Sequence, residues 1–185
     1  MSRSILLTSF TILLAMHPPI STAQPADLSH IRAFLEIDDR LATSGQIAYD
    51  DIASLKAAGY ELVINLATAD KDRNGEEGFR VVEQGMAYVH IPVSWEAPAQ
   101  RDLALFFDIL AQNRDRKVFV HCFANMRVST FVYLYRTLKE GVSEEEARTD
   151  LVAIWDPASL EQWKTFVDQA RTHHASIDTS SSGQE

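Results

Sequence analysis

The sequence predicts an α/β domain with a mainly parallel central sheet flanked by helices. Three short runs rich in valine, isoleucine and aromatic residues are typical of buried strands, and they lie at 61–66, 86–93 and 117–121. Helical patterns alternate with these runs, which is typical of a parallel sheet covered by helices on both faces. In such folds the ligand binds at the carboxyl ends of the strands, where a strand passes into a helix.

Start and stop signals delimit the helices. The first begins at the acidic pair Asp50 and Asp51 and ends at Gly59, and a later one begins with a capping box formed by Ser143 and Glu146. Apolar residues recur at helical spacing in the other predicted helices. Together the predicted helices lie at 52–58, 76–84, 101–113, 128–139, 144–155 and around 160–167.

The first 23 residues have the pattern of a secretory signal peptide. Arg3 supplies a positive start, and an uncharged apolar run follows at 5–16, which is shorter than the roughly 20 residues that cross a bilayer. Small residues at 21–23 suit cleavage after Ala23. We therefore expect a secreted or periplasmic protein without a membrane span after cleavage, with one domain at 24–175 and a flexible polar tail at 176–185. An uncleaved anchor is the alternative.

Charge and cysteine content narrow the function further. The formal net charge is −9, and so acidic a surface repels nucleic acid and anionic lipid. The chain has one cysteine, Cys122, although an exported protein of this size often carries a disulfide. A lone thiol in an oxidising compartment is either buried and inert or present for its chemistry.

The residues around Cys122 favour the chemical role. An apolar strand delivers His121 and Cys122, a short loop follows, and Arg127 stands where the next helix begins. The positive end of a helix and its free N–H groups favour the thiolate and can hold a tetrahedral anion. Arg127 offers a planar fork for two anion oxygens. The expected catalytic residues therefore include Cys122, Arg127 and Ser129, whose hydroxyl would hydrogen-bond the sulfur.

The loop itself should bind the substrate anion. His121 would orient it through a backbone hydrogen bond, and Asn125 tolerates a left-handed backbone at a tight bend. The apolar side chains of Phe123 and Met126 would line the loop or pack beneath it. The expected binding residues are His121, Phe123, Ala124, Asn125, Met126 and Arg127.

This strand, His-Cys pair, anion loop, Arg and Ser, followed by a helix, resembles the signature of tyrosine and dual-specificity phosphatases. The segments L-A-T-S-G-Q (41–46), G-Y-E-L-V-I-N-L (59–66) and Y-V-H-I-P-V (88–93) extend the similarity upstream. The layout is similar to bacterial dual-specificity-like domains, including the phosphatase-like domain of beta-lactamase-hydrolase-like proteins and the domain fused to some NAD kinases. The resemblance covers about 27–170 and implies a cysteine-phosphatase-like fold without cofactor.

One departure from the phosphatase signature concerns spacing. Four residues separate Cys122 from Arg127, whereas the resembling phosphatases have five and rhodanese-type sulfurtransferases have four. In the phosphatase families an aspartate after the preceding strand is the general acid, and Trp95 stands near that place here. Glu96 is the nearest carboxylate, and Trp95 beside it would desolvate it and raise its pKa. A solvated loop residue is the alternative interpretation of Glu96.

Other polar residues are weaker candidates. Asp70 and Asp72 follow the first predicted strand and fit a solvated turn better than a pocket mouth. His173 and His174 do not form a zinc constellation, so no metal is expected.

Three functions remain open from the sequence. The first is hydrolysis of phosphomonoesters, in a small molecule or a phosphoprotein, through a phosphocysteine. The second is sulfur transfer through a persulfide on the same cysteine. The third is binding of a phosphate or another anion without turnover.

Overall fold

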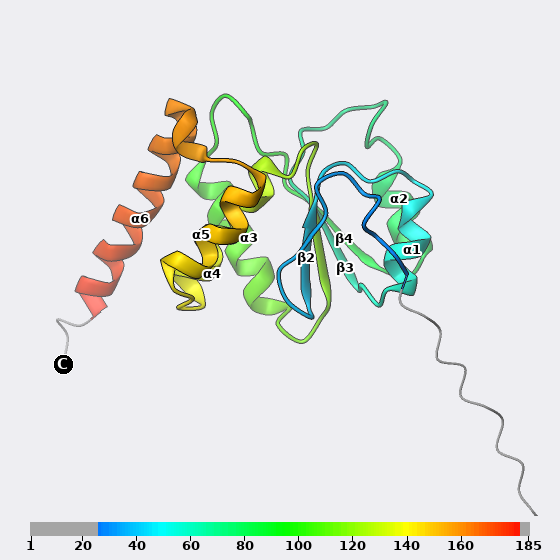
Figure 1. The fold of residues 1–185 in the computed structure, drawn as a ribbon, viewed down its shortest axis with the longest axis horizontal. Helices are drawn as coiled ribbons and strands as arrows, with labels where there is room; N and C mark the ends of the chain where they lie inside the picture. The colour runs from blue at the N-terminus through cyan, green and yellow to red at the C-terminus, as the bar shows by residue number, and fades with distance from the viewer. Residues whose placement is uncertain (1–25, 182–185) are drawn as a thin grey trace, which may run out of the picture.

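The computed structural model describes residues 26–181, with side chains to 176 (Figure 1). The predicted signal peptide at 1–23 and the last residues of the predicted tail lie outside this range.

The sheet has five strands in the order β1-β2-β5-β3-β4. Strands β2, β5, β3 and β4 are parallel, and only β1 pairs antiparallel to its neighbour, which confirms a mainly parallel sheet. The predicted strands at 61–66, 86–93 and 117–121 correspond to β3, β4 and β5, whereas β1 and β2 were not predicted. The strands are β1 (Leu35–Glu36), β2 (Leu41–Ser44), β3 (Leu62–Asn65), β4 (Ala87–His90) and β5 (Val118–His121).

Helices cover both faces of the sheet, as expected. Figure 1 shows α1 and α2 on one side and α3, α4, α5 and α6 on the other. Alternate strand residues point to opposite faces, so Phe119 joins the core under α1 and α2, and Val120 joins the core under α3 and α4. The helices are α1 (Asp51–Ala57), α2 (Glu77–Glu83), α3 (Gln100–Gln112), α4 (Met126–Lys139), α5 (Glu144–Ile154), a short 3₁₀ turn (Pro157–Ser159) and α6 (Glu161–Ser181).

The local signals that delimit helices are present in the structure. Ser143 caps α5, since its hydroxyl accepts a hydrogen bond from the Glu146 N–H. Gly59 ends the chain reversal after α1 with φ of 88°, a backbone angle that suits glycine.

Helix α6 is longer than the sequence suggested. It continues to Ser181, so the first part of the tail expected from 176 is helical. No glycine or proline occurs between Glu161 and Gly183, and polar residues alone do not end a helix. Within residues 26–181, no helix combines the length and apolar character needed to cross a membrane.

Candidate active site

Cys122 lies at the carboxyl edge of the sheet, immediately after its central strand β5. Strand β5 runs between β2 and β3, and its last residue, His121, is in register with Ser44 and Asn65. The Cys122 N–H donates to the Ser44 carbonyl at 3.3 Å, which ties the cysteine to β2. The thiol is fully buried and belongs to the core under α3 and α4. The nucleophile predicted from sequence therefore stands at a strand-to-helix junction.

Asn125 turns the chain from β5 into α4. It adopts the left-handed conformation with φ of 64°, as expected. Its side-chain amide donates to the Ala33 carbonyl at 2.8 Å and to the Thr43 hydroxyl at 3.0 Å, while its own carbonyl accepts from the Ser129 N–H. These bonds anchor the bend to the chain around β1 and β2.

A close backbone approach holds the other side of the loop. A Cβ atom at Gly45 would lie 3.0 Å from the Arg32 carbonyl oxygen and 3.2 Å from that of Phe123. Only glycine fits this space without displacing the backbone at Arg32 or at Phe123. The position therefore fixes how near the loop lies to β2.

The loop presents donors that the rest of the fold does not use. Among the hydrogen bonds of residues 26–181, none is donated by the N–H groups of Phe123, Ala124, Met126 or Arg127. The last two belong to the first turn of α4, where backbone N–H groups have no partner within the helix. Such donors at a helix start bind anions.

Arg127 is held against the loop rather than extended into solvent. Its side chain is buried, Nε donates to the Val93 carbonyl at 3.0 Å, and the guanidinium carbon lies 5.2 Å from the Trp95 ring centre. Burial holds the pKa of Arg127 below its usual value, and the nearby Cys122 only partly opposes this effect. The two predicted catalytic residues are thus close enough to influence one another electrostatically, and among the described residues the Nε bond leaves both terminal nitrogens of Arg127 for an anion.

Three tryptophans support this arrangement. Trp95, Trp155 and Trp163 pack together with ring centres 5.1–5.7 Å apart. The Trp155 indole donates to the Met126 carbonyl at 2.8 Å, and the Trp163 indole donates to the Trp95 carbonyl. The cluster joins the loop after β4, the start of α4 and the start of α6. Trp95 therefore supports Arg127 at the place where the resembling families carry an aspartate.

The role expected for Ser129 stays a prediction. Ser129 is buried on the first turn of α4, and its hydroxyl donates to the Met126 carbonyl at 3.2 Å. A hydrogen bond to the Cys122 sulfur requires the hydroxyl to rotate away from that carbonyl.

His121 differs from expectation in its partner. Its Nε2 lies 2.7 Å from Oε1 of Glu77 on α2, and both side chains are fully buried. Within the described residues its Nδ1 has no hydrogen-bond partner, so His121 does not orient the loop through the backbone bond that we expected. The reason is the strand alternation: His121 and Cys122 point to opposite faces of the sheet, and His121 faces α2.

Glu77 is the centre of a buried polar network that the sequence did not reveal. Its carboxylate also accepts hydrogen bonds from Asn65, Tyr88 and Gln46 at 2.9–3.0 Å. Burial raises the pKa of Glu77, but the hydrogen bond and charge of His121, with the bonds from Gln46 and Tyr88, outweigh it and hold the pKa below its usual value. A charged carboxylate therefore stands behind the strand that carries the cysteine.

The carboxylates proposed from sequence lie at the surface. Glu96 is exposed in the loop between β4 and α3, while the Trp95 ring packs into the tryptophan cluster. Asp70 pairs with Arg73 at 2.7 Å and closes a turn, and Asp72 is exposed beside it. The expected desolvation of Glu96 by Trp95 has no support in this arrangement.

Arg73 is a second residue that sequence reasoning missed. Its guanidinium carbon lies 3.7 Å from the ring centre of Phe123, the residue after Cys122. The loop between β3 and α2 therefore reaches the anion loop. In the sequence, the spacing of Asp70 and Arg73 indicated only a solvated turn.

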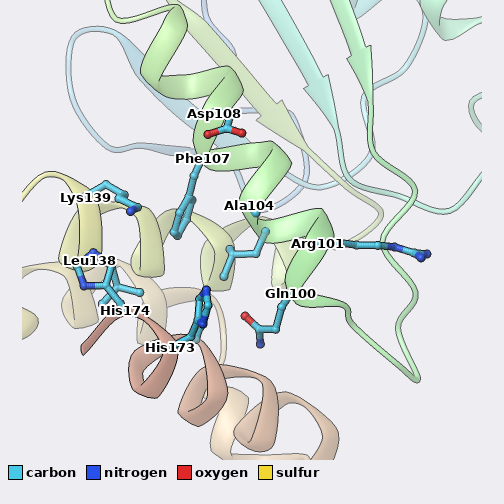
Figure 2. Close-up of a pocket in the computed structure, with 11 residues that line it drawn as sticks. Gln100, Arg101, Ala104, Phe107, Asp108, Leu138, Lys139, His173 and His174 are labelled. Atoms are coloured by element: carbon cyan, nitrogen blue, oxygen red, sulfur yellow. The ribbon is translucent and has the colours of Figure 1, made fainter. Parts of the chain in front are cut away.

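His173 and His174 of α6 line a cavity that is separate from the Cys122 loop. This cavity of about 380 Å³ lies between α3, α4 and α6, and Figure 2 shows its lining, which includes Phe107, Lys139, His173 and His174. Cys122 and Arg127 are not among its lining residues. In the part of the chain that the structure describes, no group of three or more His, Cys, Asp or Glu side chains is arranged to hold a metal ion.

Comparison with known proteins agrees with this geometry. Residues 28–175 match the family model of the DSP-PTPase phosphatase fused to NAD⁺ kinase. The DUF442 phosphatase-like protein of Shewanella putrefaciens CN-32 is 33% identical, with a TM-score of 0.71 over 80% of this chain and 96% of that one. TpbA of P. aeruginosa in complex with phosphotyrosine is 17% identical, with a TM-score of 0.61 over 85% and 99%. The search of curated proteins returned no significant match.

The fold and the loop define a cysteine-phosphatase-like domain of the tyrosine and dual-specificity type. Tk-PTP in its active form, at 17% identity and a TM-score of 0.63 over 75% of this chain and 95% of that one, has the same fold. The chain belongs to the DSP-PTPase family that the model describes, and it is a tyrosine/dual-specificity-like phosphatase.

Proposed function

We propose that this phosphatase hydrolyses phosphomonoesters through a phosphocysteine formed on Cys122. The observation that carries the proposal is the position of the buried Cys122 and the buried Arg127 at the junction of β5 and α4, beside unused backbone donors. The phosphate of the ester binds the loop N–H groups and the Arg127 guanidinium, which neutralise its charge.

The reaction proceeds in two displacements. The Cys122 thiolate attacks phosphorus, the P–O bond to the leaving group breaks, and Glu96 gives its proton to the departing oxygen. Glu96 then takes a proton from water, which attacks the phosphocysteine, so that the P–S bond breaks and phosphate leaves. Glu96 is exposed, so the bound substrate or a movement of the 94–99 loop must bring it to the leaving oxygen.

Hydrolysis of para-nitrophenyl phosphate from acidic to neutral pH tests this proposal. We expect turnover that disappears in Cys122→Ser and falls at least about a hundredfold in Arg127→Met. A large loss of turnover of phenyl phosphate in Glu96→Gln, with a much smaller loss for para-nitrophenyl phosphate, whose leaving group hardly needs a proton, supports the general acid. Equal phosphate release by the wild type and Cys122→Ser would leave anion binding without turnover as the better description.

Sulfur transfer is the second candidate, and the four-residue spacing between Cys122 and Arg127 favours it. In that reaction the thiolate attacks the outer sulfur of thiosulfate, the S–S bond breaks and sulfite leaves. The resulting persulfide then passes its outer sulfur to an acceptor such as cyanide. Intact mass spectrometry after incubation with thiosulfate distinguishes the two, because only sulfur transfer adds one sulfur atom to the wild type and none to Cys122→Ser.

We also propose that the protein is exported to the periplasm or beyond. The pattern of Arg3, the apolar run at 5–16 and the small residues before Gln24 supports this. Expression of the whole chain and sequencing of the mature N-terminus should give Gln24 as the first residue. A product that keeps Met1 and stays in the cytoplasm would contradict export.

A further inference from the structure

Arg73 lies against the anion loop. Its guanidinium stacks at 3.7 Å on the ring of Phe123, which directly follows Cys122 and is half-buried. Arg73 comes from the loop between β3 and α2, far from Phe123 in the sequence. An exposed arginine side chain seldom keeps one position without a reason, because fixing its rotamers costs entropy.

The β3–α2 loop is built to hold Arg73 in place. Nε donates to Oδ2 of Asp70 at 2.7 Å and Nη2 forms an ion pair with the same oxygen at 2.7 Å, while Oδ1 of Asp70 accepts from the N–H groups of Asp72 and Arg73. The Asp70 N–H in turn donates to the side chain of the buried Asn74. Of the Arg73 guanidinium, Nη1 has no acceptor among the described residues, so its two protons remain for a ligand.

Arg73 and Arg127 repel one another across the loop. Besides burial, the charge of Arg73 lowers the pKa of Arg127, so the two guanidiniums are electrostatically coupled. In a chain with a formal net charge of −9, Arg73 and Arg127 bring two positive charges to the same anion loop from different segments. An anion bound between or beside the two guanidiniums relieves this repulsion. A ligand with two anionic groups can place one group on Arg127 and the other on Arg73.

From this geometry we propose that Arg73 forms a second anion subsite, and that the preferred substrates are phosphoesters with a further anionic group close to the phosphate. The inference rests on the proposed phosphatase function. The reacting phosphate occupies the Cys122 loop and Arg127, and a neighbouring carboxylate or phosphate of the substrate binds Nη1 of Arg73. An acidic phosphotyrosine peptide has this chemistry.

Two pairs of phosphotyrosine pentapeptides test the subsite. Within each pair glutamate replaces glutamine, directly before the phosphotyrosine in one pair and directly after it in the other. We expect the wild type to prefer glutamate in at least one pair by about fivefold in kcat/KM, the size of one partly exposed charged hydrogen bond. In Arg73→Gln the preference should fall below about twofold, and Arg73→Lys should retain part of it.

Lys71→Gln is the matched control, since Lys71 is exposed in the same loop and the substitution removes the same charge. It should keep the wild-type preference. Circular dichroism and thermal unfolding of each variant show whether the loop substitution disturbs the fold.

Binding separates this inference from the proposed reaction. Calorimetric titration of Cys122→Ser with the same peptides should give the same preference for glutamate, and Arg73→Gln added to that variant should abolish it. If the wild type hydrolyses neither peptide while Cys122→Ser still prefers glutamate, the reaction fails and the subsite stands. The subsite is overturned if Arg73→Gln keeps the preference, or if neither hydrolysis nor binding distinguishes the peptides, including when neither peptide binds.

Discussion

Replacing Glu77 with glutamine removes one charge from the buried network behind β5 and changes the size of the side chain very little. In the wild type, Oε1 accepts hydrogen bonds from His121, Asn65 and Tyr88, and Oε2 accepts one from Gln46. The glutamine carbonyl oxygen keeps the first three as neutral bonds. The new amide, however, meets the Gln46 amide as donor against donor, and His121 loses its charged partner.

The size of the effect follows from these contacts. A hydrogen bond to a charged group contributes about 1.5–3 kcal/mol, and removal of one member of a buried charged pair costs more than loss of a surface pair. We expect Glu77→Gln to lower the free energy of unfolding by about 2–3 kcal/mol. For a domain of this length about 2–4 °C corresponds to each kcal/mol, so the midpoint of thermal unfolding should fall by about 4–12 °C.

The pH dependence gives a second and independent readout. Interactions with His121, Gln46 and Tyr88 hold the pKa of Glu77 below its ordinary value of 4.5 despite burial. The folded state therefore binds a proton at Glu77 less readily than the unfolded state does. The stability from Glu77 is present above pH of about 4.5 and is lost as the pH falls through the lower pKa of the folded state. The difference between wild type and Glu77→Gln should shrink there.

Differential scanning calorimetry of both proteins at neutral and acidic pH is the assay. Glu76→Gln is the matched control, because Glu76 is exposed and pairs with Arg80 at the surface. That substitution should change stability by less than about 1 kcal/mol. If Glu77→Gln unfolds at the same temperature as Glu76→Gln, the buried network does not stabilise the fold as we reason.

Substitutions at three further positions test the loop and a helix start. Asn125→Val places a β-branched residue at a positive φ and removes two side-chain hydrogen bonds, so urea unfolding should show a loss of about 2–4 kcal/mol, and Asn125→Gly should lose less. Gly45→Ala crowds the carbonyl oxygens of Arg32 and Phe123, and the urea midpoint should report a loss of about 1–3 kcal/mol. Ser143→Ala removes the cap of α5 and should lower stability by about 1 kcal/mol in the same assay, whereas no change would show that water replaces the cap.

Much of the fold was predictable because its signals are local. The stop at Gly59 and the cap at Ser143 depend on residues adjacent in sequence. Strand β2 was missed because its four residues end in Thr43 and Ser44, which are polar but fully buried beside β5. Only the pairing with β5 shows that these residues lie inside the protein.

The candidate site divides in the same way. Cys122, Asn125 and Arg127 follow one another along the chain, so their spacing indicated a common loop. Glu77 and Arg73 reach that region only through tertiary folding. The pattern of α2 is even misleading, since Glu77 is buried whereas Phe79 is 69% exposed on the same helix.

The tryptophan cluster gives the molecule an optical property that bears on its study. Trp95, Trp155 and Trp163 are the three tryptophans of the chain, and all three lie in one cluster that contacts Arg127 and the start of α4. The intrinsic ultraviolet emission of the protein therefore originates almost wholly beside the anion loop. A phosphate ion that draws Arg127 away from the Trp95 ring changes the surroundings of the emitting groups, so the unlabelled protein carries its own fluorescent reporter of occupancy.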